Sequence, residues 1–359
     1  MPMHLHALAT AVPPLRLTQT DCWELVQRTG LKERLNHRSW VTLAAVLRGG
    51  CGIEARHFAV DDPARVFNFT ADELNETFRR EAPQLGGRAL ASALAKAGVN
   101  AGELDALVVC TCTGYLCPGV SSYVAEALGL PANAYLQDLV GLGCGAAIPA
   151  LRAVQGVLAA NPGATVACVA VEICSAAFYL DDDSGVLISA CLFGDGAAAS
   201  IWRATPGPTG VQVRDFSTDH QPAERDRIRF EQRDGRLRNL LHSSVPGLAA
   251  AAVRKLLDAE NARPGRTPIA RILSHGGGRD VVDALEEALP GFELDATRSV
   301  LRDFGNMSSP SVFFALERAL ESGARPSPGQ DWWLTAFGAG FSAHGCRLCA
   351  SEAKVGEAD

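Results

Sequence analysis

Residues 138–163 read DLVGLGCGAAIPALRAVQGVLAANPG and place a single cysteine, Cys144, between two glycines at the start of a helix-like run. The apolar side chains that follow recur at helical spacing: Ile148, Leu151, Val154 and Leu158. An Asn-Pro-Gly sequence then ends the run. Cys144 is therefore expected at a helix N-terminus, where the helix dipole and unpaired backbone N–H groups favour a thiolate and lower the thiol pKa. The alternative is a buried cysteine that only fills space.

Outward from this stretch, strand-like apolar runs alternate with helix-like segments. The strand-like runs are 106–110, 164–173, 197–202, 270–276, 332–338 and 346–350, and the helix-like segments are 86–98, 121–129, 145–160, 246–259, 280–289 and 311–321. This alternation predicts an α/β fold with layered sheets. The pattern occurs twice, and a Pro/Gly-rich connection, ATPGPTG at 204–210, marks the change-over. We therefore predict two similar halves, 1–205 and 206–359. The charged stretch 215–240 is expected to be a solvated hairpin or loop.

Composition narrows the class of protein. The chain has 359 residues, 47% of them hydrophobic, which is enough for a large core in two halves. Its net charge is −7 and no long block of Lys or Arg occurs, so a nucleic-acid partner is not expected. The N-terminal residues lack the basic region and apolar run of a signal peptide, and no apolar stretch has membrane-spanning length. A cytoplasmic protein without a membrane span is expected.

The chain contains 11 cysteines, which do not resemble a disulfide framework. Most lie in apolar or glycine-rich surroundings, and without a secretory signal they are expected to be reduced. Cys346 and Cys349 have the CxxC spacing of a zinc or redox pair. No second pair follows, however, and the residues between them suggest an alternating strand. No metal site is predicted, and a thiol-rich metal protein is kept only as a rival hypothesis.

Two more polar residues lie at predicted element ends, where open α/β sheets place their sites. His275 follows a predicted strand and precedes three glycines, and Asn306 lies in a turn before the helix-like segment 311–321. Ser308 and Ser309 are expected to cap that helix, with Pro310 in its first turn. Each residue also has a purely structural explanation: a satisfied core histidine and a turn-forming asparagine.

Cys144, His275 and Asn306 make chemical sense as a set. A thiolate paired with a histidine attacks a thioester, and N–H groups of His and Asn side chains stabilise an enolate or tetrahedral oxyanion. Such a trio can accept an acyl group and decarboxylate a β-carboxy thioester. No metal or organic cofactor is needed for this chemistry.

At this point the sequence resembles a known family, the type III polyketide synthases, which are chalcone synthase-like enzymes of the thiolase superfamily. The motifs that carry the resemblance cover nearly the whole chain: CTGYLCPGVSSYVAEALGL (112–130), GLGCGAA (141–147), EICSAAFYL (172–180), LFGDGAAA (192–199), VPGL (245–248), SHGGG (274–278), GNMSSPSVFFALE (305–317) and AFGAGF (336–341). The resemblance implies a thiolase-like fold, in which two similar halves form a layered αβαβα architecture, and a homodimer.

The resemblance also implies residue roles. Cys144 would be the acyl-accepting nucleophile, with His275 and Asn306 completing the triad. Phe178 falls on a gatekeeper phenylalanine between the coenzyme A tunnel and the reaction cavity, and Asn239 falls where the family has a second one. Cys117 stands where plant members carry a methionine that reaches into the partner subunit's cavity. Arg48, Gly277, Gly278 and Ser308 complete the implied substrate-binding set. Asp195 in LFGDGAAA is not proposed as catalytic.

The implied activity is iterative decarboxylative condensation of malonyl-CoA onto an acyl-CoA starter, followed by cyclisation to a resorcinol or pyrone. The motifs look most like those of bacterial alkylresorcinol and alkylpyrone synthases, so a fatty acyl starter is expected first. Two other rivals stay open: an initiating ketoacyl synthase of fatty acid synthesis, which would require an acyl-carrier protein, and a non-catalytic partner subunit, which would lack a triad residue.

Overall fold

The computed structural model describes residues 2–351 and contains a large mixed sheet that curves back on itself. Nine strands follow one another across it: β11 (Ile269–Ser274), β12 (Asp331–Gly338), β13 (Ser342–Ala350), β8 (Val211–His220), β1 (Met3–Ala11), β7 (Gly196–Arg203), β6 (Val166–Glu172), β4 (Ala106–Cys110) and β5 (Tyr135–Leu139). The antiparallel pair β1–β8 joins the strands of the first half to those of the second.

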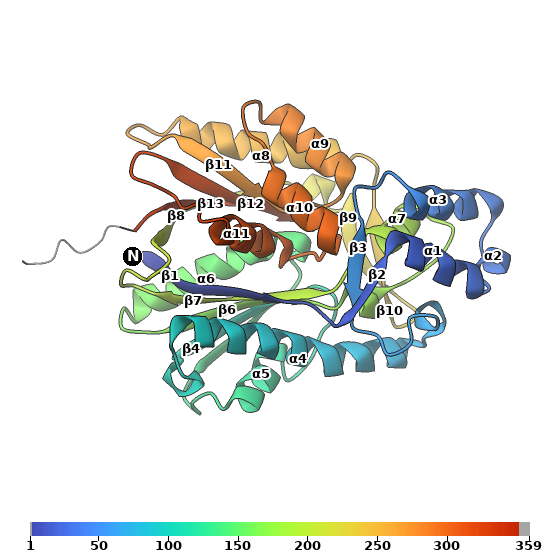
Figure 1. Cartoon of the computed structure of the whole chain (residues 1–359), viewed down its shortest axis with the longest axis horizontal. Helices are drawn as coiled ribbons and strands as arrows, with labels where there is room; N and C mark the ends of the chain where they lie inside the picture. Colours follow the sequence, from blue (N-terminus) through green and yellow to red (C-terminus); the bar gives the residue numbers. More distant parts are fainter. Residues whose placement is uncertain (1, 352–359) are drawn as a thin grey trace, which may run out of the picture.

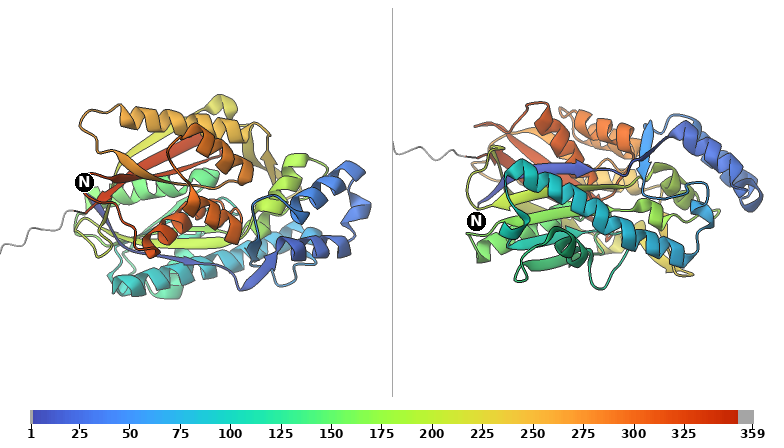
Figure 2. Two further views of the ribbon diagram at one scale, coloured as in Figure 1. Left: turned by 45° about the horizontal axis from the view of Figure 1, so that its top comes forward. Right: turned by 60° about the horizontal axis from the view of Figure 1, so that its bottom comes forward.

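Helices lie between and outside the two parts of this sheet (Figure 1). Helix α6 (Ala147–Ala160) contacts β4 and β6 on one side and β12 and β13 on the other, and α11 (Ser311–Glu321) contacts both β1 and β11. Helices α4 (Ala71–Ala97) and α5 (Val120–Leu128) cover the outer face of the first half, and α8 (Val245–Asn261), α9 (Arg279–Ala288) and α10 (Asp295–Phe304) lie over the second (Figures 1 and 2). This arrangement confirms the layered αβαβα prediction.

Strands β4 and β6 are almost entirely apolar because helices cover both faces of the sheet there. Every residue of β4 and of β6 is buried, including the charged Glu172 at the end of β6. The predicted strands and helices are all present, with one helix much longer than expected. The segment 86–98 is only the end of the 27-residue helix α4, which starts at a Thr70–Glu73 capping box and contains Pro83. Because of that proline and the polar first turns, the sequence pattern does not indicate the first part of this helix.

A smaller group of elements forms one end of the molecule (Figure 1). It comprises β2 (Leu15–Thr18), α1 (Gln19–Arg28), α2 (Leu31–Arg34), α3 (His37–Arg48), β3 (Ala55–Phe58), α7 (Ser184–Leu192), β9 (Ile228–Arg233) and β10 (Arg236–Leu241). The expectation of a solvated hairpin or loop at 215–240 was wrong in part. These residues contain the end of β8 and the β9–β10 hairpin, and Asn239 within the hairpin is only 8% exposed.

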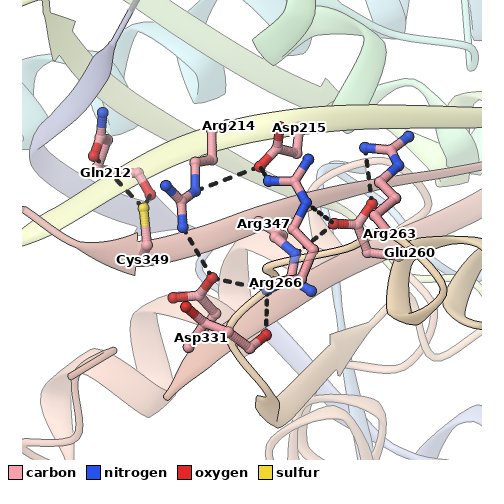
Figure 3. A network of polar contacts seen from close by, with 10 residues as sticks. Gln212, Arg214, Asp215, Glu260, Arg263, Arg266, Asp331, Arg347 and Cys349 are labelled. Carbon is pink, nitrogen blue, oxygen red and sulfur yellow. Dashed lines mark hydrogen bonds and ion pairs between the residues drawn. The ribbon is translucent and has the colours of Figure 1, made fainter. Parts of the chain in front are cut away.

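A buried cluster of charges ties together β8, β12, β13 and α8 (Figure 3). The Arg347 guanidinium is fully buried and contacts Glu260, with a second ion pair to Asp331 at 2.8 Å. Arg214 also pairs with Asp331, and Arg266 pairs with Asp215 at 2.5 Å. Because a buried charge is costly without a partner, this cluster holds the four elements in one arrangement.

Cys346 and Cys349 lie on the regular strand β13, so side chains three positions apart point to opposite faces. The prediction that Cys346 and Cys349 lie on an alternating strand is therefore confirmed.

Within residues 2–351, no helix combines the length and apolar character needed to cross a bilayer.

Candidate active site

Cys144 lies in a short 3₁₀ turn, Gly143–Gly145, directly before helix α6. Gly143 has φ +56°, a conformation that other residues adopt only with strain. The end of β12 packs against this turn so closely that a Cβ on Gly338 would lie 2.6 Å from Gly145 N and 2.8 Å from Cys144 N. The predicted position at the mouth of a helix is confirmed, and the flanking glycines allow this close approach. The thiol residue is 7% exposed.

His275 follows strand β11, as expected, and its backbone N–H donates to Thr335 O at 3.0 Å. The imidazole is 2% exposed and packs edge-on against Phe337, with ring centroids 5.3 Å apart. Its Nδ1 is buried without a hydrogen-bond partner among the described residues. The same Phe337 lies next to Gly145 through its backbone, so one segment of β12 contacts both the histidine and the cysteine turn.

A chain of polar contacts leads from the glycines after His275 to the cysteine. Asn306 donates from Nδ2 to Gly277 O at 2.7 Å, and its Oδ1 accepts from Ser308 N at 2.8 Å. Ser308 Oγ then lies 3.2 Å from Cys144 Sγ. Ser308 and Ser309 were expected to cap helix α11, but this was wrong, because Pro310 is the N-cap residue and no side chain caps the helix. The Ser308 hydroxyl contacts Cys144 instead, and the Ser309 hydroxyl donates to a buried carboxylate behind it.

A buried carboxylate, Glu172, lies behind these serines and was missed in the sequence. It accepts from Ser309 Oγ at 2.6 Å, from Thr113 Oγ1 at 2.8 Å and from Cys112 N at 2.9 Å, and Ser308 Oγ is 3.4 Å away. Burial raises the pKa of Glu172, and the hydrogen bond from Ser309 opposes this shift. The available signal was a lone carboxylate at the end of an apolar strand. Such a residue needs buried partners.

The expected lowering of the Cys144 pKa was wrong for the resting site. Burial raises the pKa of Cys144 to about 12, against the opposing hydrogen bond from Ser308. Burial also lowers the pKa of His275 to about 4. Burial favours the neutral form of both groups, so at neutral pH the resting site holds a thiol and a neutral imidazole. The helix N-terminus alone does not produce the thiolate.

Cys144 opens into a cavity of about 600 Å³, part of it open to solvent, which we call the reaction cavity. Phe178, Asn239 and Ser308 line it together with Cys144, as the resemblance implied. The alternative that Asn239 lies on a charged surface loop was therefore wrong. Residues that the sequence did not single out complete much of the wall: Cys112, Thr113, Cys174, Tyr179, Val186, Ser189, Phe193, Ile228, Arg229, Phe230 and Ala339.

The remaining expected site residues divide into two groups. Asn306 forms a strand-like bridge with Phe193 of the cavity wall, and Gly277 and Gly278 follow His275 beside Asn306 and Leu192. Arg48 and Cys117, by contrast, are exposed and do not line the reaction cavity of their own chain. The structure thus links Asn306 to Cys144 through Ser308 and brings Phe178, Asn239 and Ser308 to the cavity beside Cys144, whereas His275 and Asn306 are not among the residues that line this cavity. The catalytic and binding roles stay predictions.

Comparison with known proteins gives consistent matches over the chain. Residues 22–207 match the family model "FAE1/Type III polyketide synthase-like protein", and residues 222–350 match "Chalcone and stilbene synthases, C-terminal domain". A 3,5-dihydroxyphenylacetyl-CoA synthase from Streptomyces toyocaensis is 33% identical, with 78% of this chain and 74% of that protein covered. A 1,3,6,8-tetrahydroxynaphthalene synthase from Streptomyces peucetius subsp. caesius is 29% identical, with 94% and 90% covered.

Solved structures show the same fold. The 1,3,6,8-tetrahydroxynaphthalene synthase of Streptomyces coelicolor superimposes with a TM-score of 0.85 at 24% identity, covering 98% of this chain and 100% of that one. PKS-I from the brown alga Ectocarpus siliculosus gives a TM-score of 0.87 at 24% identity, with 97% and 98% covered.

Proposed function

This chain belongs to the type III polyketide synthases, and from that premise we propose that it condenses malonyl-CoA units onto an acyl-CoA starter carried on Cys144, then cyclises the product to a resorcinol or pyrone. The observation that carries the proposal is the hydrogen-bonded series Gly277–Asn306–Ser308–Cys144, of which Ser308 and Cys144 line the reaction cavity. His275 precedes Gly277 by two residues, and its ring packs against Phe337, whose backbone adjoins the cysteine turn. The family matches fit this proposal better than they fit the ketoacyl synthase hypothesis or the partner-subunit hypothesis.

In the first step the Cys144 sulfur attacks the starter thioester carbonyl, a C–S bond forms, and the CoA thiol leaves with a proton. Because burial favours the neutral thiol of Cys144, we propose that Cys144 loses its proton as the C–S bond forms, with His275 as the general base that accepts the proton and passes it to the leaving CoA thiol. The Ser308 hydroxyl, 3.2 Å from Sγ, is placed to donate to the developing charge.

In the second step malonyl-CoA loses CO₂ and the electron pair passes to an enolate of the thioester. An amide nitrogen carries two protons, and Gly277 O accepts one from Asn306. The second proton of Asn306 and the imidazole N–H of His275 are proposed to bind the enolate oxygen. The carbanion then attacks the acyl–Cys144 carbonyl, a C–C bond forms, and the thiolate is released. We propose no metal or organic cofactor, since these groups supply the charge stabilisation.

An aliphatic acyl group is the proposed starter. Two facing phenylalanines would narrow the passage, and this chain has Phe178 on one side and the smaller Asn239 on the other. One relative is a 3,5-dihydroxyphenylacetyl-CoA synthase, and the 3,5-dihydroxyphenyl group in that name is a resorcinol ring. Resorcinol formation in this chain remains part of the proposal.

We also propose a homodimer built on the edge strand β5. This strand has a neighbour on one side only, and Tyr135 is 53% exposed, with Val140 50% exposed just beyond it. Tyr115 is 74% exposed on the loop that also carries the exposed Cys117. An exposed apolar edge strand can pair with a strand of another chain. A two-fold axis would bring the β5 strands of two copies of this chain together. Cys117 would then approach the partner's cavity. A cytoplasmic location stays a prediction.

The direct test of function is incubation of the purified protein with malonyl-CoA and a series of acyl-CoAs from acetyl to dodecanoyl, with products identified by mass spectrometry. The proposal predicts CO₂ release and polyketide products without acyl-carrier protein. An absolute requirement for acyl-carrier protein would replace it with the ketoacyl synthase hypothesis. No condensation with any starter would refute it.

A further inference from the structure

A second buried histidine packs against the Gly143–Gly145 turn from inside the molecule. His344 lies on β13, on the face that also presents Cys346 and Leu348 to the apolar core around α6, and it is 6% exposed. A Cβ on Gly145, the residue after the nucleophile, would lie 3.2 Å from His344 Cδ2. Because a buried polar ring is costly unless its nitrogens are hydrogen-bonded, the partners of His344 indicate its role.

Both imidazole nitrogens of His344 have partners. Nδ1 lies 3.1 Å from Thr218 Oγ1 on β8, and Nε2 lies 3.1 Å from Ser342 Oγ. Ser342 Oγ in turn donates to Ala339 O at 3.0 Å. These contacts form one hydrogen-bonded series that runs from β8 through β13 to the loop 339–341, which joins β12 to β13.

The directions of these hydrogen bonds determine where the ring carries its proton. A serine hydroxyl has one proton, and that of Ser342 goes to Ala339 O, so Ser342 can only accept from His344. Nε2 therefore carries the ring proton, and Nδ1 accepts the proton of Thr218 Oγ1. Burial lowers the pKa of His344 to about 4, so at neutral pH the ring has the neutral form that this series requires.

The far end of the series belongs to the candidate active site. Ala339 lines the reaction cavity, and its backbone nitrogen would lie 2.9 Å from a Cβ on Gly143. The loop thus packs against the residue before Cys144, while the ring of His344 packs against Gly145, the residue after it. His344 therefore supports the backbone on both sides of the nucleophile.

We propose that His344 is a positioning residue for acyl transfer, which acts through Ser342 to hold the loop at Ala339 against the turn that carries Cys144. This inference rests on the proposed function and adds to it a residue that does not line the reaction cavity. A displacement of about 1 Å between reacting groups can slow a reaction about 100-fold. Loss of His344 should therefore slow attack of the sulfur on the thioester. Decarboxylation of malonyl-CoA, which is proposed to use other side chains, should be unchanged.

The test is the single-turnover rate of acyl transfer from butanoyl-CoA to Cys144, measured by rapid quenching and intact-protein mass spectrometry over a range of butanoyl-CoA concentrations. His344→Phe keeps a ring but removes both nitrogens, and Ser342→Ala removes the next member of the series. In each variant the limiting rate should fall about tenfold. The half-saturating concentration should be unchanged, because neither residue lines the reaction cavity.

Two matched variants separate positioning from a general effect on the core. His344→Gln places an amide N–H close to the position of the imidazole Nε2 and should restore the limiting rate to within about threefold of the unaltered protein. His4→Phe is the control, because His4 is also a strand residue, is 5% exposed and lies 2.8 Å from a serine hydroxyl, but does not line the reaction cavity. Its limiting rate should equal that of the unaltered protein.

Unchanged limiting rates in His344→Phe and Ser342→Ala would overturn the proposal, as would an equal fall in His4→Phe or in the rate of malonyl-CoA decarboxylation. If His344→Phe does not fold, Ser342→Ala decides the question, because it removes only one oxygen atom. An acyl adduct that forms at the same rate in every variant rejects only the role of His344. Absence of an adduct in the unaltered protein with every starter rejects the proposed function itself.

Discussion

Ser308→Ala tests whether the serine activates the nucleophile. The hydroxyl of Ser308 lies 3.2 Å from both Cys144 Sγ and Cys112 Sγ and 3.4 Å from Glu172 Oε1. A hydroxyl has one proton to donate, and both Cys144 Sγ and Glu172 Oε1 lie within its reach; we take the Cys144 sulfur as the acceptor once it becomes a thiolate. A hydrogen bond to a charged group contributes about 1.5–3 kcal/mol, and 1.36 kcal/mol corresponds to one pKa unit. Removing the hydroxyl should thus raise the pKa of Cys144 by about one to two units.

The assay is the rate of Cys144 alkylation by iodoacetamide as a function of pH, followed by peptide mass spectrometry. At a fixed pH below the thiol pKa, the thiolate fraction should fall about 10- to 100-fold. A more basic thiolate is also a better nucleophile, and this offsets about half of the decrease in the logarithm of the alkylation rate. The observed rate should therefore fall about three- to tenfold.

Ser309→Ala is the matched control, because Ser309 bonds Glu172 at 2.6 Å and has no contact with the sulfur. Ser308→Gly provides a second check. Ser308 has φ +59°, so glycine removes the hydroxyl and relieves a conformation that costs other residues about 1–2 kcal/mol. Ser308→Gly should be as unreactive as Ser308→Ala yet more stable to urea. Identical alkylation profiles in Ser308→Ala and Ser309→Ala would refute the reasoning.

Further predictions concern the triad, the cavity and stability. His275→Ala and Asn306→Ala should each slow malonyl-CoA decarboxylation about 100-fold or more, whereas a change below threefold would show that neither donates to the enolate. Asn239→Phe should shift starter preference toward short acyl-CoAs, in graded steps of about 1–3 kcal/mol, and an unchanged starter profile would contradict this. Arg347→Ala should lower the free energy of unfolding by about 3–5 kcal/mol in urea, whereas Arg254→Ala, at an exposed ion pair, should change it by less than about 1 kcal/mol. Because burial lowers the pKa values of His275 and His344 to about 4, these two side chains bind more protons in the unfolded chain than in the native one below pH 6.5, and their contribution to the free energy of unfolding should fall from there toward pH 4.

Much of the architecture could be predicted from pattern alone. Strands such as β4 and β6 are continuous apolar runs, and buried parallel strands read this way because helices cover both faces. The helix after Cys144 was evident from the spacing of its apolar residues and its terminal Asn-Pro-Gly. The polar first part of α4 was not, because it has few apolar residues to mark its buried face and Pro83 interrupts the helical pattern.

The site was only partly visible in the sequence. Glycine-flanked polar residues at element ends indicated Cys144, His275 and Asn306, and the resemblance located Asn239. The roles of Ser308, Ser309 and Glu172 could not be predicted, because Glu172 meets Thr113, 59 positions away, and Ser308 and Ser309, 136 and 137 positions away, only in the folded chain. The pKa values could not be read either. A helix N-terminus is visible in a sequence, but the burial that raises the pKa of Cys144 arises only when β12 packs onto its turn.

The central claim is that Cys144 carries the growing chain. Intact-protein and peptide mass spectrometry should be applied to the unaltered protein and to Cys144→Ala after brief incubation with dodecanoyl-CoA or butanoyl-CoA, followed by malonyl-CoA. We predict one acyl adduct on Cys144, its conversion to polyketide product when malonyl-CoA is added, and neither adduct nor product in Cys144→Ala. An adduct on another of the 11 cysteines, or full-length product from Cys144→Ala, would contradict the claim.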